Sequence, residues 1–569
     1  MELTPQQPPR APGPEDSFDT GWTAPDALPP DPASLAEPPP PTMRTTLRRA
    51  AFGMVAGAVL VTGAVVAVPD DDKDAATPVP GPVSRAMTAT AAGSPASLPD
   101  LTALIADRQK WVGTHPSDAP AWAVLGSAYV ERGRRAADPA YYTRAEQALK
   151  RSLDVRPGEK GNTAAWVGLA SLANARHDFV TAKKWGETVR ARQPKEWTVY
   201  PELIDAYNGL GDRKSAITAV ERFTELRAGV PALGRAAEMY RDRGWREDAL
   251  ATAQDAANRA RTPAEKAACL TRLGELAWER GEPKEAVAQY GAALRVVKGH
   301  HPALAGRARA LVALGRTDEA VRDYQAALAK SPRPAYLLEL GELYESLGLD
   351  GDSVGQYEKL RAALERGTAR GVDEALPLGR FEAAHGDADA AVELLRAEWE
   401  RGHRSPAVAD ALGWALHRSG DSDGALEYAQ RAVDSGGQNA SYAYHLGMVQ
   451  RAVNDFGSAR RQLEAALRTN PAFSPLDAPL AREALDNLGE PPAGGPADMR
   501  PPPAPEPPPA AEPQAPEPQA PAPQRQSASG GGPAPAPAAG AQGRQGAAPA
   551  AAVAHTPVQP SPAPSAGER

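Results

Sequence analysis

The chain has 569 residues, a net charge of −8 and a single cysteine, Cys269. One thiol excludes an internal disulfide framework and a cysteine-rich metal site. The charge is close to neutral for this length and no basic stripe occurs, so we expect no nucleic-acid partner. Arginine greatly outnumbers lysine in an Ala-, Gly- and Pro-rich background, a composition typical of GC-rich genomes such as those of actinobacteria.

Both ends of the chain are rich in proline. Residues 1–42 and 490–569 together hold more than half of the 59 prolines and few large apolar residues. Such segments bury too little apolar surface to offset the entropy lost when a backbone is ordered. We therefore predict a disordered Pro-rich N-terminal tail over 1–42 and a disordered Pro/Ala/Gln-rich tail over 490–569.

An uncharged apolar run occupies residues 50–68. Its length approaches the roughly 20 residues that a helix needs to cross a bilayer. The run is preceded by a basic flank that contains three arginines, Arg44, Arg48 and Arg49. The flank and the run together make up residues 43–68. Because positive flanks stay inside, we predict a single transmembrane helix in the cell membrane, with a cytoplasmic N-terminus and the rest of the chain outside the cytoplasm.

Two alternatives to this anchor stay open: a buried core helix, and a cleaved signal sequence that starts at Met43. The run is longer than the usual apolar core of a cleaved signal, which favours an uncleaved anchor. Gly53 and Gly57 form a GxxxG face through which two such helices could self-associate. Residues 69–98, before the first helical periodicity, read as a linker.

One pattern recurs about ten times at a spacing of roughly 34 residues between Ala121 and Pro471. Good copies of it are Trp122–Tyr129 and Leu337–Tyr344, and each copy is followed by one small residue at the same place: Ala145, Ala182, Ala216, Ala249, Ala286, Ala320, Ser353, Ala391, Ala425 and Ala459. The pattern resembles the tetratricopeptide repeat (TPR) family of helix–turn–helix units. The resemblance implies an all-α fold, a right-handed α-solenoid of about ten units over residues 99–489.

The turns inside the units carry further predictions. Glycine stands at most of them, and His177 and Asn454 replace it in two units, so we expect left-handed backbone there. Extra residues in the first unit predict a protruding loop near 139–142. Pro377 predicts a kink or joint in the eighth unit, and 479–488 read as a helix that caps the solenoid.

No motif for catalysis or cofactor binding occurs. The chain lacks a phosphate loop, HExxH, Gly-x-Ser-x-Gly and CxxC, and its nine histidines are scattered. We predict that the protein is not an enzyme and has no catalytic residue, no cofactor and no metal. An envelope enzyme with paired acids across the groove remains as an alternative.

In TPR arrays the first helix of each unit lines the concave surface. Transferring this rule to the chain implies a candidate protein-binding groove of fifteen residues: Asp205, Asn208, Glu238, Arg241, Glu275, Trp278, Arg309, Glu342, Glu345, Arg380, Trp414, His417, Tyr444, Met448 and Arg451. The middle of this face reads as acidic. Its C-terminal part combines Trp, Tyr and Arg, the residue types that dominate binding hot spots, and is the best candidate surface.

The resemblance and the apolar run together suggest a function. We expect a membrane-anchored protein–protein interaction scaffold that binds a protein or peptide in the concave groove, with the anchor raising the effective concentration. An accessory or chaperone-like factor for protein export or envelope assembly, including cytochrome c assembly, is an alternative that rests on analogy of fold.

Overall fold

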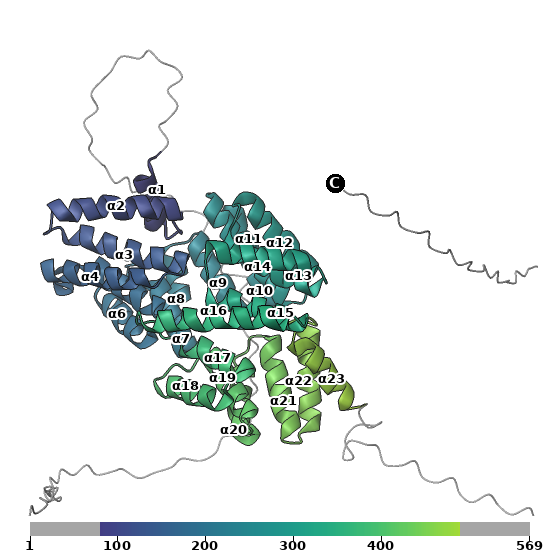
Figure 1. Cartoon of the computed structure of the whole chain (residues 1–569). Coiled ribbons are helices and arrows are strands. Elements are labelled where there is room, and N and C mark those ends of the chain that lie inside the picture. The colour runs from purple at the N-terminus through teal and green to yellow at the C-terminus, as the bar shows by residue number, and fades with distance from the viewer. Residues whose placement is uncertain (1–79, 490–569) are drawn as a thin grey trace, which may run out of the picture.

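A computed structural model describes residues 80–489 of the protein. All secondary structure in this part of the chain is helical, and Figure 1 shows the helices stacked side by side along a curved path. No helix between residues 80 and 489 is both long and apolar enough to cross a membrane. The candidate span at 50–68 and the two Pro-rich tails lie outside the described residues.

Two helices precede the repeats, α1 (Pro82–Ala92) and α2 (Leu98–Thr114). The first lies in the range that the sequence suggested as a linker. It starts with a proline at its first position and ends at Gly93, whose φ of 73° gives the left-handed C-cap. Arg85 of α1 pairs with Asp100 of α2 at 2.6 Å, so the two helices are tied together.

The next twenty helices form ten pairs, which we number units 1 to 10. In chain order they are α3 (Ala119–Ala136) and α4 (Ala140–Val155); α5 (Thr163–Ala175) and α6 (Phe179–Arg192); α7 (Val199–Leu210) and α8 (Arg213–Leu226); α9 (Val230–Asp242) and α10 (Arg246–Arg259); α11 (Pro263–Glu279) and α12 (Pro283–Val296); α13 (His301–Ala313) and α14 (Thr317–Lys330); α15 (Pro334–Ser346) and α16 (Asp350–Thr368); α17 (Ala375–His385) and α18 (Ala388–Glu400); α19 (Pro406–Arg418) and α20 (Ser422–Val433); α21 (Ala440–Ala452) and α22 (Phe456–Thr469). A short 3-10 helix, Gly158–Lys160, follows unit 1, and α23 (Asp477–Asn487) follows unit 10 as the predicted capping helix.

The crossing of the two helices in each unit confirms the register of the repeat. All ten small residues at this place are buried, and the most exposed of them, Ala216, is 5% exposed. Glycine on the partner helix makes room for large side chains: a Cβ on Gly274 would lie 2.6 Å from the ring of Tyr290, which is fully buried. The repeated phrase therefore encodes close helix packing.

Most turns inside the units have the expected left-handed residue. His177 and Asn454 have φ values of 59° and 64°, like the glycines that they replace. An aspartate follows each of them and caps the second helix, because Asp178 and Asp455 accept a backbone N–H three residues later.

Unit 1 differs from the prediction. Its extra residues lengthen α3 instead of forming a protruding loop, and the left-handed residue is Ala137, with a φ of 51°. Gly133 lies inside the helix, where a Cβ would come within 2.6 Å of the Tyr142 ring. The glycine serves close packing here and not a turn.

Unit 8 begins with the predicted joint. Pro377 occupies the first turn of α17, where proline is tolerated, so the helix starts there without a kink. α17 packs mainly on α18 and α19 and has few contacts with α16. The stack is therefore loosest between units 7 and 8.

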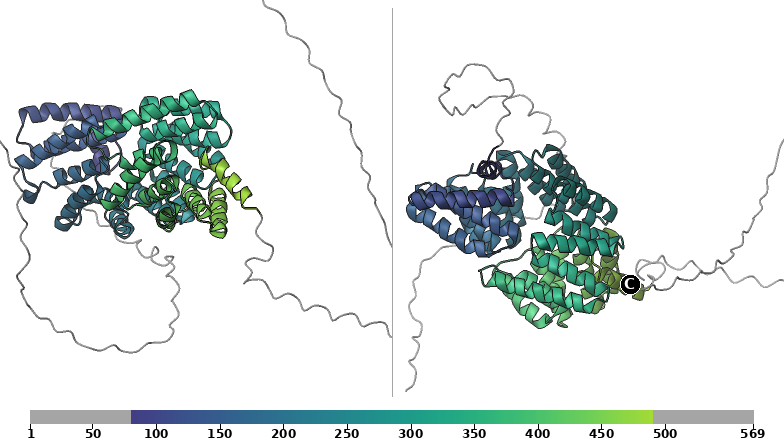
Figure 2. Two further views of the ribbon diagram at one scale, coloured as in Figure 1. Left: turned by 60° about the horizontal axis from the view of Figure 1, so that its bottom comes forward. Right: turned by 45° about the horizontal axis from the view of Figure 1, so that its top comes forward.

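The array winds tightly enough for its second half to contact its first half (Figure 2). The turn inside each of units 1 to 5 meets the loop that leaves the unit five further along. We call this line of contacts the seam. It consists of Arg333 Nη2 to Arg134 O (2.8 Å), Asp373 N to Arg176 O (2.8 Å), Gly211 beside Arg404, Gly244 beside Gly436, and Asn470 Nδ2 to Trp278 O (2.9 Å).

Two glycines of the seam serve two needs at once. Gly211 and Gly244 have φ values of 72° and 76°, which favour glycine over any L-residue with a side chain. A Cβ on Gly244 would also lie 2.6 Å from the carbonyl oxygen of Gly436, and one on Gly211 would overlap the carbonyl of Arg404. The backbones of the two superhelical turns therefore touch directly.

Candidate functional site

The concave face carries a ladder of ion pairs between neighbouring units. Arg235 stands 2.7 Å from Asp205 and 3.3 Å from Glu238, and Arg309 stands 2.9 Å from Glu339 and 3.5 Å from Glu275. Further along, His385 contacts Glu342 and Glu345, at 3.4 and 3.2 Å. Several of the acids that made this face read as acidic are therefore paired with arginines, whereas Glu342 and Glu345 contact a histidine.

The ladder is strong enough to shift ionisation. Burial by itself would raise the pKa of Glu238, but Arg272 and Arg235 outweigh it and bring the pKa down to about 2. Asp410, 2.8 Å from the ring of His445, raises the pKa of that imidazole against the effect of burial. Most of the concave charge thus satisfies itself and is not free to attract a charged partner.

The aromatic groups expected on the C-terminal part of the face are largely covered. Tyr444 is 1% exposed because α23 packs on it, in a cluster with Ala481 and Ala484. Trp414 is half-buried and stacks on His445 with ring centroids 4.2 Å apart, and Met448 joins the same core as Tyr444. This part of the predicted groove is mostly packing surface.

A cavity of about 1250 Å³ lies where the two turns of the superhelix face each other. Its walls come from units 2 to 6 on one side and from the loop after unit 7 and units 8 to 10 on the other. Trp399 borders the wall but is only 9% exposed, and two exposed arginines, Arg404 and Arg431, lie 5.7 and 5.2 Å from its ring centroid. The exposed amides of Asn208 and Asn439 also line it.

This lining suits a polypeptide segment. The exposed arginines supply a contact type that anchors protein interfaces, and the asparagine amides can pair with a peptide backbone. The volume is above the usual range for a small-molecule pocket.

The cavity gathers one third of the residues predicted from the sequence. Five of the fifteen line it: Asn208, Arg241, Glu275, Trp278 and Arg309. The other ten do not. Four of those, Asp205, Glu238, Glu342 and Glu345, belong to the ion-pair ladder, while Arg380, His417 and Arg451 lie outside the cavity with Trp414, Tyr444 and Met448.

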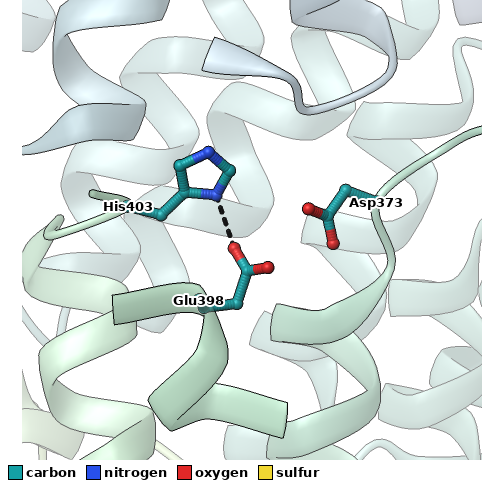
Figure 3. Close-up of side chains that lie close together, drawn as sticks. All are labelled: Asp373, Glu398 and His403. Carbon is teal, nitrogen blue, oxygen red and sulfur yellow. Dashed lines mark hydrogen bonds and ion pairs between the residues drawn. The ribbon is translucent and has the colours of Figure 1, made fainter. Parts of the chain in front are cut away.

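Three chemically notable residues on the cavity wall were missed by the sequence analysis. Asp373, Glu398 and His403 bring one ligand atom each to within 4.8 Å of one another, and Figure 3 shows their side chains converging. They come from two loops and the end of α18, and their spacing matches no metal motif. Only the fold brings Asp373 to the other two.

Comparison with known sequences supports the repeat assignment. Residues 305–366 match the Tetratricopeptide repeat family, and residues 84–163 match the Bacterial transcriptional activator domain. The first match covers units 6 and 7 apart from their ends, and the second covers α1 to α4. A comparison with curated proteins gives no match.

The chain is also similar to solved structures, at low identity and low TM-score. A tetratricopeptide repeat protein from Parabacteroides merdae is 18% identical, with 46% of this chain and 99% of that chain covered, at a TM-score of 0.29. TTC0263, a TPR protein of Thermus thermophilus, is 23% identical over 33% and 98% of the two chains, at 0.28. A chain of the APC/C complex Cut9–Hcn1 is 14% identical over 72% and 86%, at 0.35.

Tetratricopeptide arrays are generally protein–protein interaction scaffolds and are typically non-catalytic. The match at units 6 and 7, the ten helix pairs and the buried small residue at every crossing agree with one another. Residues 119–469 form a solenoid of ten helix–turn–helix units, and units 6 and 7 match the tetratricopeptide repeat family.

Proposed function

We propose that the protein is a membrane-anchored scaffold that binds a segment of a partner protein in the cavity between the two superhelical turns. The observation that carries the proposal is the lining of this cavity, which combines two exposed arginines packed on the buried Trp399 with exposed amides. The concave face elsewhere is occupied by its own ion pairs, so it offers fewer groups to a ligand.

The anchor is part of the same proposal. The apolar run 50–68 would hold the solenoid at the outer face of the cell membrane, where a tethered binding site gains effective concentration for membrane-associated partners. Resistance of the full chain to extraction with alkaline carbonate would support the anchor. Protease access to the solenoid in intact spheroplasts would support the outward orientation, and full protection there would contradict it.

Photo-crosslinking tests the binding site directly. A benzoylphenylalanine placed at Asn208, on the cavity wall, is expected to crosslink a defined set of partner proteins in cells. The same group at Phe456, which is 53% exposed and does not line the cavity, serves as the control. The proposal is wrong if both positions capture the same proteins.

A substitution then measures the contribution of the arginine–tryptophan cluster. Arg431 is exposed, so Arg431→Ala should fold normally while weakening binding of the crosslinked partner by about 10-fold, the effect of losing one hot-spot contact. Arg316→Ala, at an exposed arginine away from the cavity, should leave the affinity unchanged.

A further inference from the structure

The cluster of Asp373, Glu398 and His403 has the donor set of a metal site. Glu398 and His403 are 3% and 5% exposed, so their polar atoms are withdrawn from bulk water. The three ligand atoms, two carboxylate oxygens and one imidazole nitrogen, lie within 4.8 Å of one another. Figure 3 shows the carboxylate of Asp373 reaching the other two side chains from a separate loop.

Two carboxylates this close together, one of them buried and the other 20% exposed, need a positive charge. Arg401 supplies one: its Nη2 stands 2.9 Å from Asp373 Oδ2 and also contacts Glu398 Oε1. The arginine side chain is 54% exposed, and its contact with Glu398 lacks the geometry of a hydrogen bond, so the buried Oε1 accepts none. The positive charge is therefore provided by a long side chain that can turn into solvent without a movement of the backbone.

The histidine already faces one of the carboxylates. His403 Nδ1 lies 2.5 Å from Glu398 Oε2, so two of the three ligand atoms are adjacent.

We propose that Asp373, Glu398 and His403 bind one Zn²⁺ ion, with Arg401 displaced into solvent. Zinc takes imidazole nitrogen and carboxylate oxygen at bond lengths near 2.0–2.2 Å and accepts three protein ligands with a fourth position open. Ligand atoms of a tetrahedral zinc site lie about 3.3 Å apart, so Asp373 has to approach and the 2.5 Å contact between Glu398 and His403 has to widen when the ion binds. The inference does not depend on the proposed binding function.

The position of the site gives the ion a structural role. The loop that carries Asp373 bonds to the turn inside unit 2, because its backbone N–H donates to Arg176 O and its carbonyl lies 2.8 Å from the ring of His177. The ring of His403 packs edge-on against Phe179, with centroids 5.4 Å apart. A metal held by these residues ties the exit loops of units 7 and 8 together at the seam.

Zinc titration of the full chain, untagged, purified in mild detergent and stripped with EDTA, tests the site. Competition with a fluorescent chelator should give one equivalent of bound Zn²⁺, and zinc should raise the thermal melting temperature. His403→Ala and the isosteric Glu398→Gln should each weaken binding by at least about 100-fold. Circular dichroism checks that each variant is folded.

Two further variants make the test specific. His445→Ala disrupts another buried histidine–carboxylate pair, His445–Asp410, and should retain the zinc equivalent. Arg401→Ala removes the competing cation and should tighten binding on the order of 10-fold. The proposal is overturned if wild-type protein binds no zinc, if His403→Ala keeps the equivalent, or if Arg401→Ala binds no more tightly.

Discussion

The packing inside each unit and the seam between units five apart are built from different chemistry. Inside a unit, alanine and glycine bring two helices together around buried side chains such as Leu149 and Tyr290, both 0% exposed. The seam consists of backbone carbonyls, an amide side chain and a guanidinium. The units should therefore set the stability of the fold, whereas the seam sets how tightly the superhelix is wound and is the part that can open.

The largest effect is expected inside a unit. Leu149 packs against Gly126 and Gly168, so Leu149→Ala leaves a cavity and should lower the free energy of unfolding by about 2–5 kcal/mol. Urea denaturation followed by circular dichroism measures the change. Leu250→Ala, at a residue that is 37% exposed, is the control, and an equal loss there would refute the assignment of Leu149 to the core.

A smaller effect is expected at the seam. Asn470 is 3% exposed, and Asn470→Ala removes one of the donors to the Trp278 carbonyl, which keeps the N–H of Gly281, at a cost of about 0.5–1.5 kcal/mol. Small-angle scattering should report a larger radius of gyration, while the helical circular dichroism stays unchanged. Loss of helical signal at the same denaturant concentration as in Leu149→Ala would show that seam and units are not separable. Asn258→Ala, on the outer face of α10, is the control.

Acid should weaken the packing beside the seam. Burial lowers the pKa of His300 to about 4, and Arg135 lowers it further in the same direction. Because the unfolded state takes up the proton first, this contribution to stability is present above pH 6.5 and is lost as the pH falls toward 4. The unfolding midpoint of His300→Asn should therefore depend less on pH between 6.5 and 4 than that of the wild type. An equal pH dependence in both proteins would contradict this.

The smallest effect is expected at exposed ion pairs. Arg316 and Glu319 form one at 2.8 Å on the outer surface of α14. Solvent and salt screen such a pair, so Arg316→Ala should leave the melting temperature unchanged within error. A clear drop in differential scanning calorimetry would mean that outer-surface charges contribute to winding.

The sequence predicts the units better than the seam, for a physical reason. Each crossing depends on residues only about 10 to 25 positions apart, such as Gly274 and Tyr290, and the repetition of one pattern confirms it ten times. Seam contacts join residues 192 to 199 positions apart, such as Asn470 and Trp278, and depend on the rotation accumulated over five units. No local sequence pattern encodes this accumulated rotation.

The prediction of the candidate site from the sequence is limited in the same way. The rule that the first helix of each unit lines the concave surface correctly selects Trp278 and Arg309, which belong to first helices and lie on the cavity wall. It fails for Tyr444, since the rule does not anticipate that α23 folds over unit 10. It also misses Asp373 and His403, which lie in loops that reach the cavity only after the superhelix closes on itself.

The closed superhelix is tested most directly by a distance across the seam. Spin labels at Lys284→Cys in unit 5 and Arg468→Cys in unit 10, with Cys269→Ala to remove the native thiol, allow double electron–electron resonance in the full chain. In an extended array these positions would lie roughly 50 Å apart, at about 10 Å per unit. The structure predicts a single narrow distribution below half of that distance, because Gly281 and Asn470 are in contact. A broad distribution centred near the extended value would contradict the account.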